Sequence, residues 1–139
     1  MKRSLLAAIL LAFLAAPAFA QPFMSTIPAR GASGNQANAN AVATLPGVAN
    51  RITYISGFQC TASGATTGLP VNATVTDGTW TFTYSFVFPA GVLVSATPLV
   101  VQFNPPFPAS AQNTPITVTL PASGAGGTNA ACNAQGYQL

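Results

Sequence analysis

Apolar and polar side chains alternate with a period of two along much of this chain. The clearest case is Thr79–Phe88, in which an aromatic residue occupies every even position and Thr, Ser or Val every odd one. Only a β-strand places residues i, i+2 and i+4 on one face. The pattern therefore predicts a strand with rings on one face and mostly hydroxyl groups on the other. Because hydroxyl groups suit water, we expect the rings to contribute to the core.

The same alternation predicts further strands on both sides of this stretch. Val71–Thr76 precedes it, and the Asp77-Gly78 pair between them is typical of a β-hairpin with a type I′ turn, which needs positive φ at both central positions. Asn104–Pro108 is expected to be an extended crossover, because its prolines donate no ladder hydrogen bonds. The other predicted strands are Ala41–Leu45, Arg51–Thr61, Pro98–Phe103, Ile116–Leu120 and Ala130–Gln138.

Short strands separated by Gly- and Pro-rich turns, with no helical periodicity, predict an all-β fold. We expect an antiparallel β-sandwich or jelly roll of roughly six to eight strands. The sandwich domain should span residues 39–139. Residues 21–38 show no sustained periodicity, and we expect them to form a flexible or extended N-terminal arm.

Residues 1–20 have the three parts of a secretory signal peptide. Lys2 and Arg3 are followed by an apolar run over Leu5–Ala16 and by an Ala-x-Ala cleavage pattern at Ala18–Ala20. This predicts export to the periplasm, the cell surface or the medium. The apolar run is shorter than the ~20 residues of a bilayer span, so we expect no membrane segment after cleavage. A retained N-terminal anchor is the alternative.

Cys60 and Cys132 are the only cysteines of the chain. In an exported protein a disulfide is the expected state, and two buried free thiols are the alternative. A disulfide needs Cα atoms about 4.4–6.8 Å apart, so it predicts that the two strands that carry these residues are neighbours. A redox or metal role is not expected, because there is no Cys-x-x-Cys motif, no His and no nearby acid.

The inventory of reactive side chains excludes most enzyme classes. The chain has no His, and Asp77 is its only acidic residue. Ser-His-Asp and Cys-His sites, paired catalytic carboxylates and zinc or calcium sites need residues that are absent. We therefore predict no enzymatic activity, no cofactor and no metal site. Without the signal peptide, the charged side chains are Arg30, Arg51 and Asp77, which give a net charge of +1. This charge is too small for binding to a nucleic acid.

The scarcity of charge suggests how the protein works. Only 4% of the residues are charged, against about 25% in a typical soluble domain. Such a surface suits packing against copies of the same protein or within a larger assembly. The alternative is a secreted carbohydrate- or surface-binding module that stacks sugars on Trp80, Tyr54 or Tyr84. Rings exposed in a groove would favour sugar binding, and buried rings with a flat neutral surface would favour assembly.

Four phrases of the chain carry a resemblance to a known group of proteins. They are TLPGVANRITYISGFQCT, GTWTFTYSFVFPAG, TPLVVQFNPPFPASAQNTPITVTLPASGAG and TNAACNAQGYQL. Roughly Ala39–Leu139 resembles small, mostly uncharacterised β-sandwich proteins encoded among the virion genes of tailed phages and prophages. The resemblance implies a virion-associated structural or decoration role and assigns no functional residues. This chain differs from the group in its signal peptide and in Cys60 and Cys132, where apolar residues are usual.

Taken together, these patterns predict an exported, non-catalytic structural or adhesion module that acts by packing or assembly.

Overall fold

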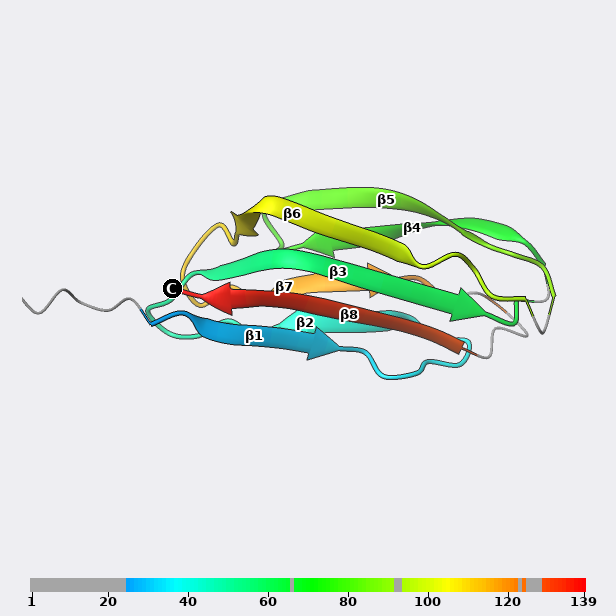
Figure 1. Cartoon of the computed structure of the whole chain (residues 1–139), viewed down its shortest axis with the longest axis horizontal. Coiled ribbons are helices and arrows are strands. Elements are labelled where there is room, and N and C mark those ends of the chain that lie inside the picture. Colours follow the sequence, from blue (N-terminus) through cyan, green and yellow to red (C-terminus); the bar gives the residue numbers. More distant parts are fainter. Residues whose placement is uncertain (1–24, 66, 92–93, 123, 125–128) are drawn as a thin grey trace, which may run out of the picture.

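The computed structural model describes residues 25–65, 67–91, 94–122, 124 and 129–139. These residues contain no helix and form eight strands in two sheets that face each other (Figure 1). The strands are β1 (Ile27–Ala32), β2 (Ala41–Leu45), β3 (Thr53–Ser63), β4 (Leu69–Thr76), β5 (Thr81–Phe88), β6 (Leu99–Pro108), β7 (Ile116–Leu120) and β8 (Asn129–Gln138). Sheet A has the order β1-β8-β3-β6, and sheet B has the order β2-β7-β4-β5.

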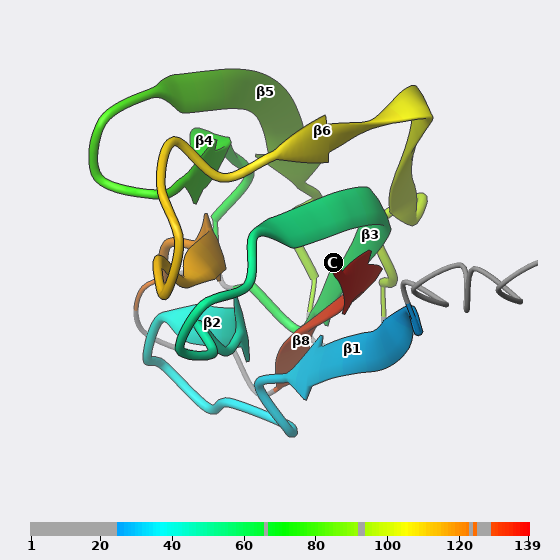
Figure 2. The same ribbon diagram turned by 90° about the vertical axis from the view of Figure 1, so that its left-hand side faces the viewer.

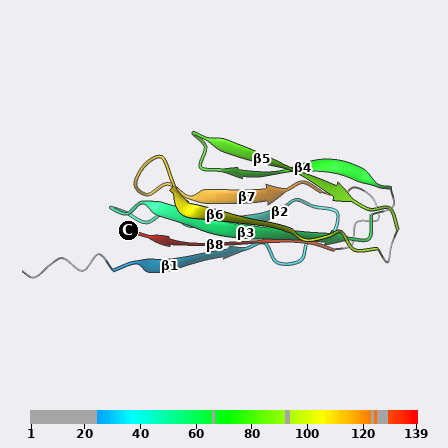
Figure 3. The same ribbon diagram turned by 45° about the horizontal axis from the view of Figure 1, so that its top comes forward.

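The strands pair in a nested way that defines the topology. β1 pairs with β8, β2 with β7, β3 with β6 and β4 with β5, always antiparallel. This is one long hairpin folded over on itself, and the further pairs β3–β8 and β4–β7 complete the two sheets. The result is the strand order of an eight-stranded jelly roll. Figure 2 shows the two sheets end-on, and Figure 3 shows the strands running along the long axis. The predicted all-β sandwich is confirmed.

Alternation along each strand decides which side chains enter the core. In β7, Ile116, Val118 and Leu120 are fully buried, whereas Thr117 and Thr119 between them are partly exposed. In β5, Phe86 and Phe88 are buried on the same face as the half-buried Phe82 and Tyr84, and the Thr and Ser side chains lie on the other face. The interior is therefore built from the inward-facing apolar residues of both sheets, as the period-two pattern predicts.

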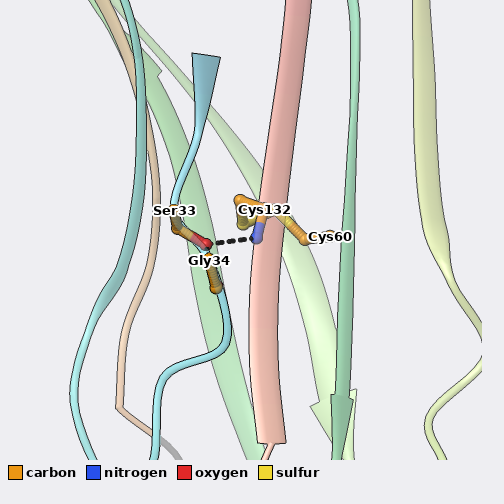
Figure 4. The surroundings of a disulfide bond; sticks show 4 residues. All are labelled: Ser33, Gly34, Cys60 and Cys132. Atoms are coloured by element: carbon orange, nitrogen blue, oxygen red, sulfur yellow. Dashed lines mark hydrogen bonds between the residues drawn. A yellow bond between two sulfur atoms is a disulfide. The ribbon is translucent and has the colours of Figure 1, made fainter.

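A disulfide joins the two central strands of sheet A. Cys60 of β3 and Cys132 of β8 lie directly opposite each other, with Cα atoms 4.2 Å apart, and both are fully buried. The predicted disulfide and the predicted adjacency of the two strands are confirmed. Ser33, just after β1, is hydrogen-bonded to the same point of β8: the Cys132 amide donates to Ser33 Oγ at 2.9 Å (Figure 4).

Two sequence-based expectations about the ends of strands are wrong. Residues 27–32 were expected in a flexible or extended arm outside the sandwich, but they form β1, which pairs with β8 over its whole length. Asn104–Pro108 was expected to be a crossover after a strand ending at Phe103, but it continues β6, in which Phe107 and Pro108 lie opposite Ile55 and Tyr54. β6 is at the edge of its sheet, where the missing proline N–H groups are tolerated. Residues 1–20, the predicted signal peptide, lie outside the described residues.

The predicted hairpin is confirmed, but its turn differs from the expected one. β4 and β5 pair without interruption, and Thr76 opposite Thr81 closes a four-residue loop over 77–80. In this loop only Gly78 has a positive φ, of 92°. The Asp77 carboxylate instead accepts hydrogen bonds from the amides of Thr79 and Trp80 at 2.9 and 3.0 Å. An Asp side chain that closes its own loop replaces the type I′ turn.

Removing the disulfide should lower the free energy of unfolding. The bond links residues 72 positions apart, and in the chain-entropy picture closing such a loop stabilises the fold by on the order of 4 kcal/mol, as an upper figure. We expect the double variant Cys60→Ala/Cys132→Ala to lose about 2–4 kcal/mol in urea unfolding. Wild-type protein that is unfolded in the presence of a reducing agent should show a loss of similar size. An unchanged unfolding midpoint in both would contradict the role assigned to the bond.

Candidate functional site

The two long sides of the sandwich, where the edge strands of the sheets approach each other, are closed in different ways. On one side β1 and β2 are in contact, and the Cα of Gly31 in β1 lies so close to the backbone of Thr44 that a side chain there would collide with it. On the other side β5 and β6 are the edge strands, and no backbone pairing joins them within the described residues. Aromatic rings fill the space between them.

These rings form a continuous cluster, which we call the ring cluster. Phe82 of β5 lies with its ring centre 6.1 Å from that of Phe103 and 5.0 Å from that of Phe107, both in β6. Trp80 packs edge-on against Phe107 at 5.0 Å. Each of these four rings is only partly buried, so the cluster is in contact with the core on one side and with solvent on the other. Sheet A and sheet B are thus joined here by side chains alone.

Two of the three candidate sugar-stacking residues belong to this region. Trp80 lies in the hairpin loop rather than in β5, and its Nε1 is buried without a hydrogen-bond partner among the described residues. Tyr84 packs edge-on against Phe58 with ring centres 5.3 Å apart, and burial raises the pKa of its hydroxyl. Trp80 also contacts the ring of Phe82, at 5.1 Å between centres, so both candidate rings are partly buried by packing against other rings.

The third candidate, Tyr54, lies on a different surface. It is on the outward face of sheet A, and its ring is stacked on that of Tyr137 with centres 5.1 Å apart and planes 12° apart. Tyr137 was not among the candidate residues predicted from the sequence. The disulfide register alone would place Gln138 opposite Tyr54, but a β-bulge between Ile55 and Gly57 shifts the pairing by one residue and brings Tyr137 there. The structure therefore does not bring Tyr54 together with Trp80 and Tyr84.

The edge of β5 is the least protected of the four sheet edges. β1 carries Pro28 and Arg30, β6 carries three prolines, and β2 has five residues and contacts β1. In contrast, β5 has eight residues with no charge and no proline, and its outward-facing Val87 is 63% exposed. Edge strands usually carry Lys, Pro or a bulge that prevents pairing with another chain. β5 has none of these, and it pairs only with β4 among the described residues.

The single carboxylate side chain serves the fold at the tip of this hairpin. Asp77 Oδ2 accepts a hydrogen bond from the Ser110 amide at 2.6 Å, and the Ser110 hydroxyl donates to Thr79 Oγ1 at 3.1 Å. Asp77 thus fastens the β6–β7 connection to the β4–β5 loop. Partial desolvation acts to raise the pKa of Asp77, but hydrogen bonds from Ser110, Trp80 and Thr79 outweigh it and lower the pKa from 3.8 to about 2.

Neither a group of metal ligands nor a membrane-spanning helix is found among the described residues. They contain no group of three or more His, Cys, Asp or Glu side chains that could hold a metal ion. Within the same residues, no helix is long and apolar enough to cross a membrane. None of the family models, curated proteins or solved structures with which the chain was compared matches it.

Because the pKa of Asp77 is lowered in the folded state, the free energy of unfolding should depend on pH in the acidic range. A group whose pKa is lower in the folded than in the unfolded state stabilises the fold above its unfolded pKa, here about 4. That stabilisation is lost as the pH falls through the folded value of about 2. Asp77→Asn should be less stable than wild type at neutral pH, and its urea midpoint should change less between about pH 4 and about pH 2.

Asp77 is the only acidic side chain in the chain, so no other side-chain carboxylate contributes to the difference in pH dependence between the variant and the wild type. The C-terminal carboxylate is common to both proteins and serves as the internal control. Equal pH dependence in the variant and the wild type would show that the hydrogen bonds to Asp77 do not favour its charged form.

Proposed function

We propose that this protein is an exported, non-catalytic structural or adhesion module that assembles with copies of itself through the edge of β5. The proposal rests on one observation above the others: β5 is a long, uncharged and proline-free strand at an open sheet edge. Its unpaired backbone groups are a template for another strand. The half-buried ring cluster lies alongside this edge, so a strand added there would also cover apolar surface.

The strand is suited to pairing with itself. In an antiparallel pair, residues directly opposite each other lie on the same face of the sheet. If two copies of β5 pair about Tyr84, Phe82 of one copy lies opposite Phe86 of the other, and Thr83 lies opposite Ser85. Rings then meet rings and hydroxyl groups meet hydroxyl groups. No charge is present on β5 to oppose this contact, and a two-fold axis is the commonest symmetry of protein dimers.

The architecture and the resemblance of the sequence are consistent with such a role. Jelly rolls are common in viral capsid subunits, and they also occur in lectins. The fold by itself does not imply either function. The sequence resemblance to virion-associated β-sandwich proteins of tailed phages favours the structural role. A disulfide is typical of an oxidising compartment, and this supports an exported module rather than one that acts in the cytoplasm.

Sugar stacking on Trp80, Tyr54 and Tyr84 has less support. A sugar binds to the open face of a ring, but the rings of Trp80 and Tyr84 pack against other rings, and Tyr54 is stacked on Tyr137. The three residues also lie on two different surfaces. Assembly through β5 needs no such platform, and it accounts for an edge strand that would otherwise be unprotected.

A charge on β5 should disrupt assembly. We expect the mature wild-type protein to have at least the mass of a dimer in size-exclusion chromatography with light scattering. Thr83→Lys places a charge on the exposed face of β5. In the pairing about Tyr84, the two introduced ammonium groups are diagonal neighbours across the interface, within reach of their long side chains, and they repel each other. The variant should shift to the mass of a monomer, with a dissociation constant weakened by about tenfold or more.

Thr44→Lys is the matched control, because it adds the same charge to the outward face of the same sheet, on the edge strand β2. This variant should retain the mass of the wild type. A wild-type protein that is monomeric at all accessible concentrations would refute assembly through β5. So would equal dissociation of both variants.

Export should remove residues 1–20. Expression of the full chain in a bacterial host should give a periplasmic or secreted product whose N-terminal residue is Gln21. Its intact mass should be lower by two hydrogens than that of the same chain with both cysteines reduced, because Cys60 and Cys132 are bonded. Replacement of Leu10 by Arg interrupts the apolar run and should retain the precursor in the cytoplasm. Recovery of an unprocessed chain in the membrane fraction would instead support a retained anchor.

A further inference from the structure

We propose that the outward face of sheet A binds an oligosaccharide that carries a carboxylate group. The site is a shallow hollow of about 450 Å³, which is lined by residues from all four strands of the sheet. Its principal side chains are Arg30, Gln59, Val100, Gln102, Asn133 and Gln135. It is separate from the edge of β5, which belongs to the other sheet, and it contains none of the rings considered above as sugar-stacking residues.

The hollow lies next to the β-bulge in β3. At the bulge, Gly57 lies between Gln135 of β8 and Gln102 of β6. A Cβ at position 57 would be only 2.6 Å from the side-chain oxygen of Gln102 and 2.8 Å from the carbonyl oxygen of Val101. Any other residue would therefore displace the Gln102 amide. The missing side chain at Gly57 thus lets the Gln102 side chain, which lines the hollow, lie directly against the backbone of β3.

The strand register places the polar side chains of the hollow in two adjacent rows. Arg30, Gln135 and Gln102 belong to the row that contains Gly57. Asn133 and Gln59 belong to the next row, in which they lie opposite each other. All five side chains are exposed on the outward face. Because they project from paired strands, their spacing is set by the sheet rather than by a mobile loop.

These groups have the chemistry that a sugar requires. Each Asn or Gln amide offers both hydrogen-bond donors and an acceptor. It can therefore bind two neighbouring hydroxyl groups of a sugar, one as acceptor and the other as donor. None of the five side chains forms a hydrogen bond or ion pair with another described residue, so their polar atoms are available to a ligand. Val100, which is 57% exposed at the edge of the hollow, supplies an apolar contact for the C–H groups of a sugar ring.

Arg30 gives the site its preference for an acidic sugar. The only acidic side chain of the protein, Asp77, is at the tip of the β4–β5 hairpin in sheet B, where it is bonded to Ser110. No side-chain carboxylate therefore neutralises Arg30. A guanidinium group binds a carboxylate through two parallel hydrogen bonds. A nucleic acid would need several cations to bind its phosphates, and Arg30 is the only one in the hollow.

The experiment is a titration of the ¹⁵N-labelled mature protein with a trimer of galacturonic acid, followed by NMR. The neutral trimer of galactose serves as the comparison ligand. We expect shift changes at the amide signals of the five polar residues of the hollow, and tighter binding of the acidic trimer. Arg30→Gln should weaken binding of the acidic trimer by roughly tenfold and leave the neutral trimer unaffected. Gln102→Ala should weaken both.

Arg51→Gln is the matched control, because it removes the same charge from a side chain that is outside the hollow and donates to the Ser25 carbonyl oxygen. It should leave both affinities unchanged. An equal loss of affinity for the acidic trimer in Arg51→Gln and Arg30→Gln would overturn the proposal, because binding would then reflect the overall charge of the protein. An absence of shift changes at millimolar ligand, or changes confined to the ring cluster, would also overturn it.

The same titration with an acidic peptide and a single-stranded oligonucleotide tests other classes of ligand, and tighter binding of either one in the hollow would overturn the sugar assignment. Repeating the sugar titration with Thr83→Lys separates this site from assembly. The hollow should bind equally well in that variant, whatever its oligomeric state.

Discussion

The pairing of β3 with β8 is the constraint on which the rest of the structure depends. Cys60 and Cys132 fix these strands to each other at the centre of sheet A. β1 and β6 then add on either side, and Ser33 attaches the end of β1 to Cys132. A chain with 4% charged residues has few ion pairs with which to specify strand order. The disulfide and the apolar face of each strand therefore take on that role.

The unequal closure of the two sides of the sandwich connects the fold to the proposed assembly. Where β1 and β2 meet, a glycine permits close contact of the backbones. Where β5 and β6 meet, large rings hold the sheets apart, so the edge of β5 stays open and the rings stay partly exposed. The same aromatic side chains that join the sheets thus leave an unpaired edge. The outward face of sheet A is a second, independent surface, formed by polar side chains of its four strands rather than by the rings.

The local elements of the fold could be predicted because their causes are local. Alternation in Val71–Thr76 and in the aromatic strand predicted β4 and β5, and the cysteines predicted that β3 and β8 are neighbours. The errors arose where a distant partner decided the outcome. Residues 27–32 lack a clear apolar pattern, yet β8 provides a backbone to pair with. The proline-rich end of β6 is a strand because it lies at an edge. Asp77 closes its loop because its carboxylate finds the amides of Thr79, Trp80 and Ser110.

The sequence by itself determined which face of each strand is apolar, that the fold is all-β, and that Asp77 is the one acidic side chain in a chain without His. These properties follow from residue types and from the period of two, which any strand must obey. Only the tertiary structure decided which edge is left open and which side chains share a surface. Gln102 and Gln135 lie on either side of Gly57 because β6 and β8 both pair with β3, and Tyr54 meets Tyr137 because a bulge shifts the register between β3 and β8. Such a shift depends on the packing of neighbouring strands, and the pattern within one strand does not reveal it.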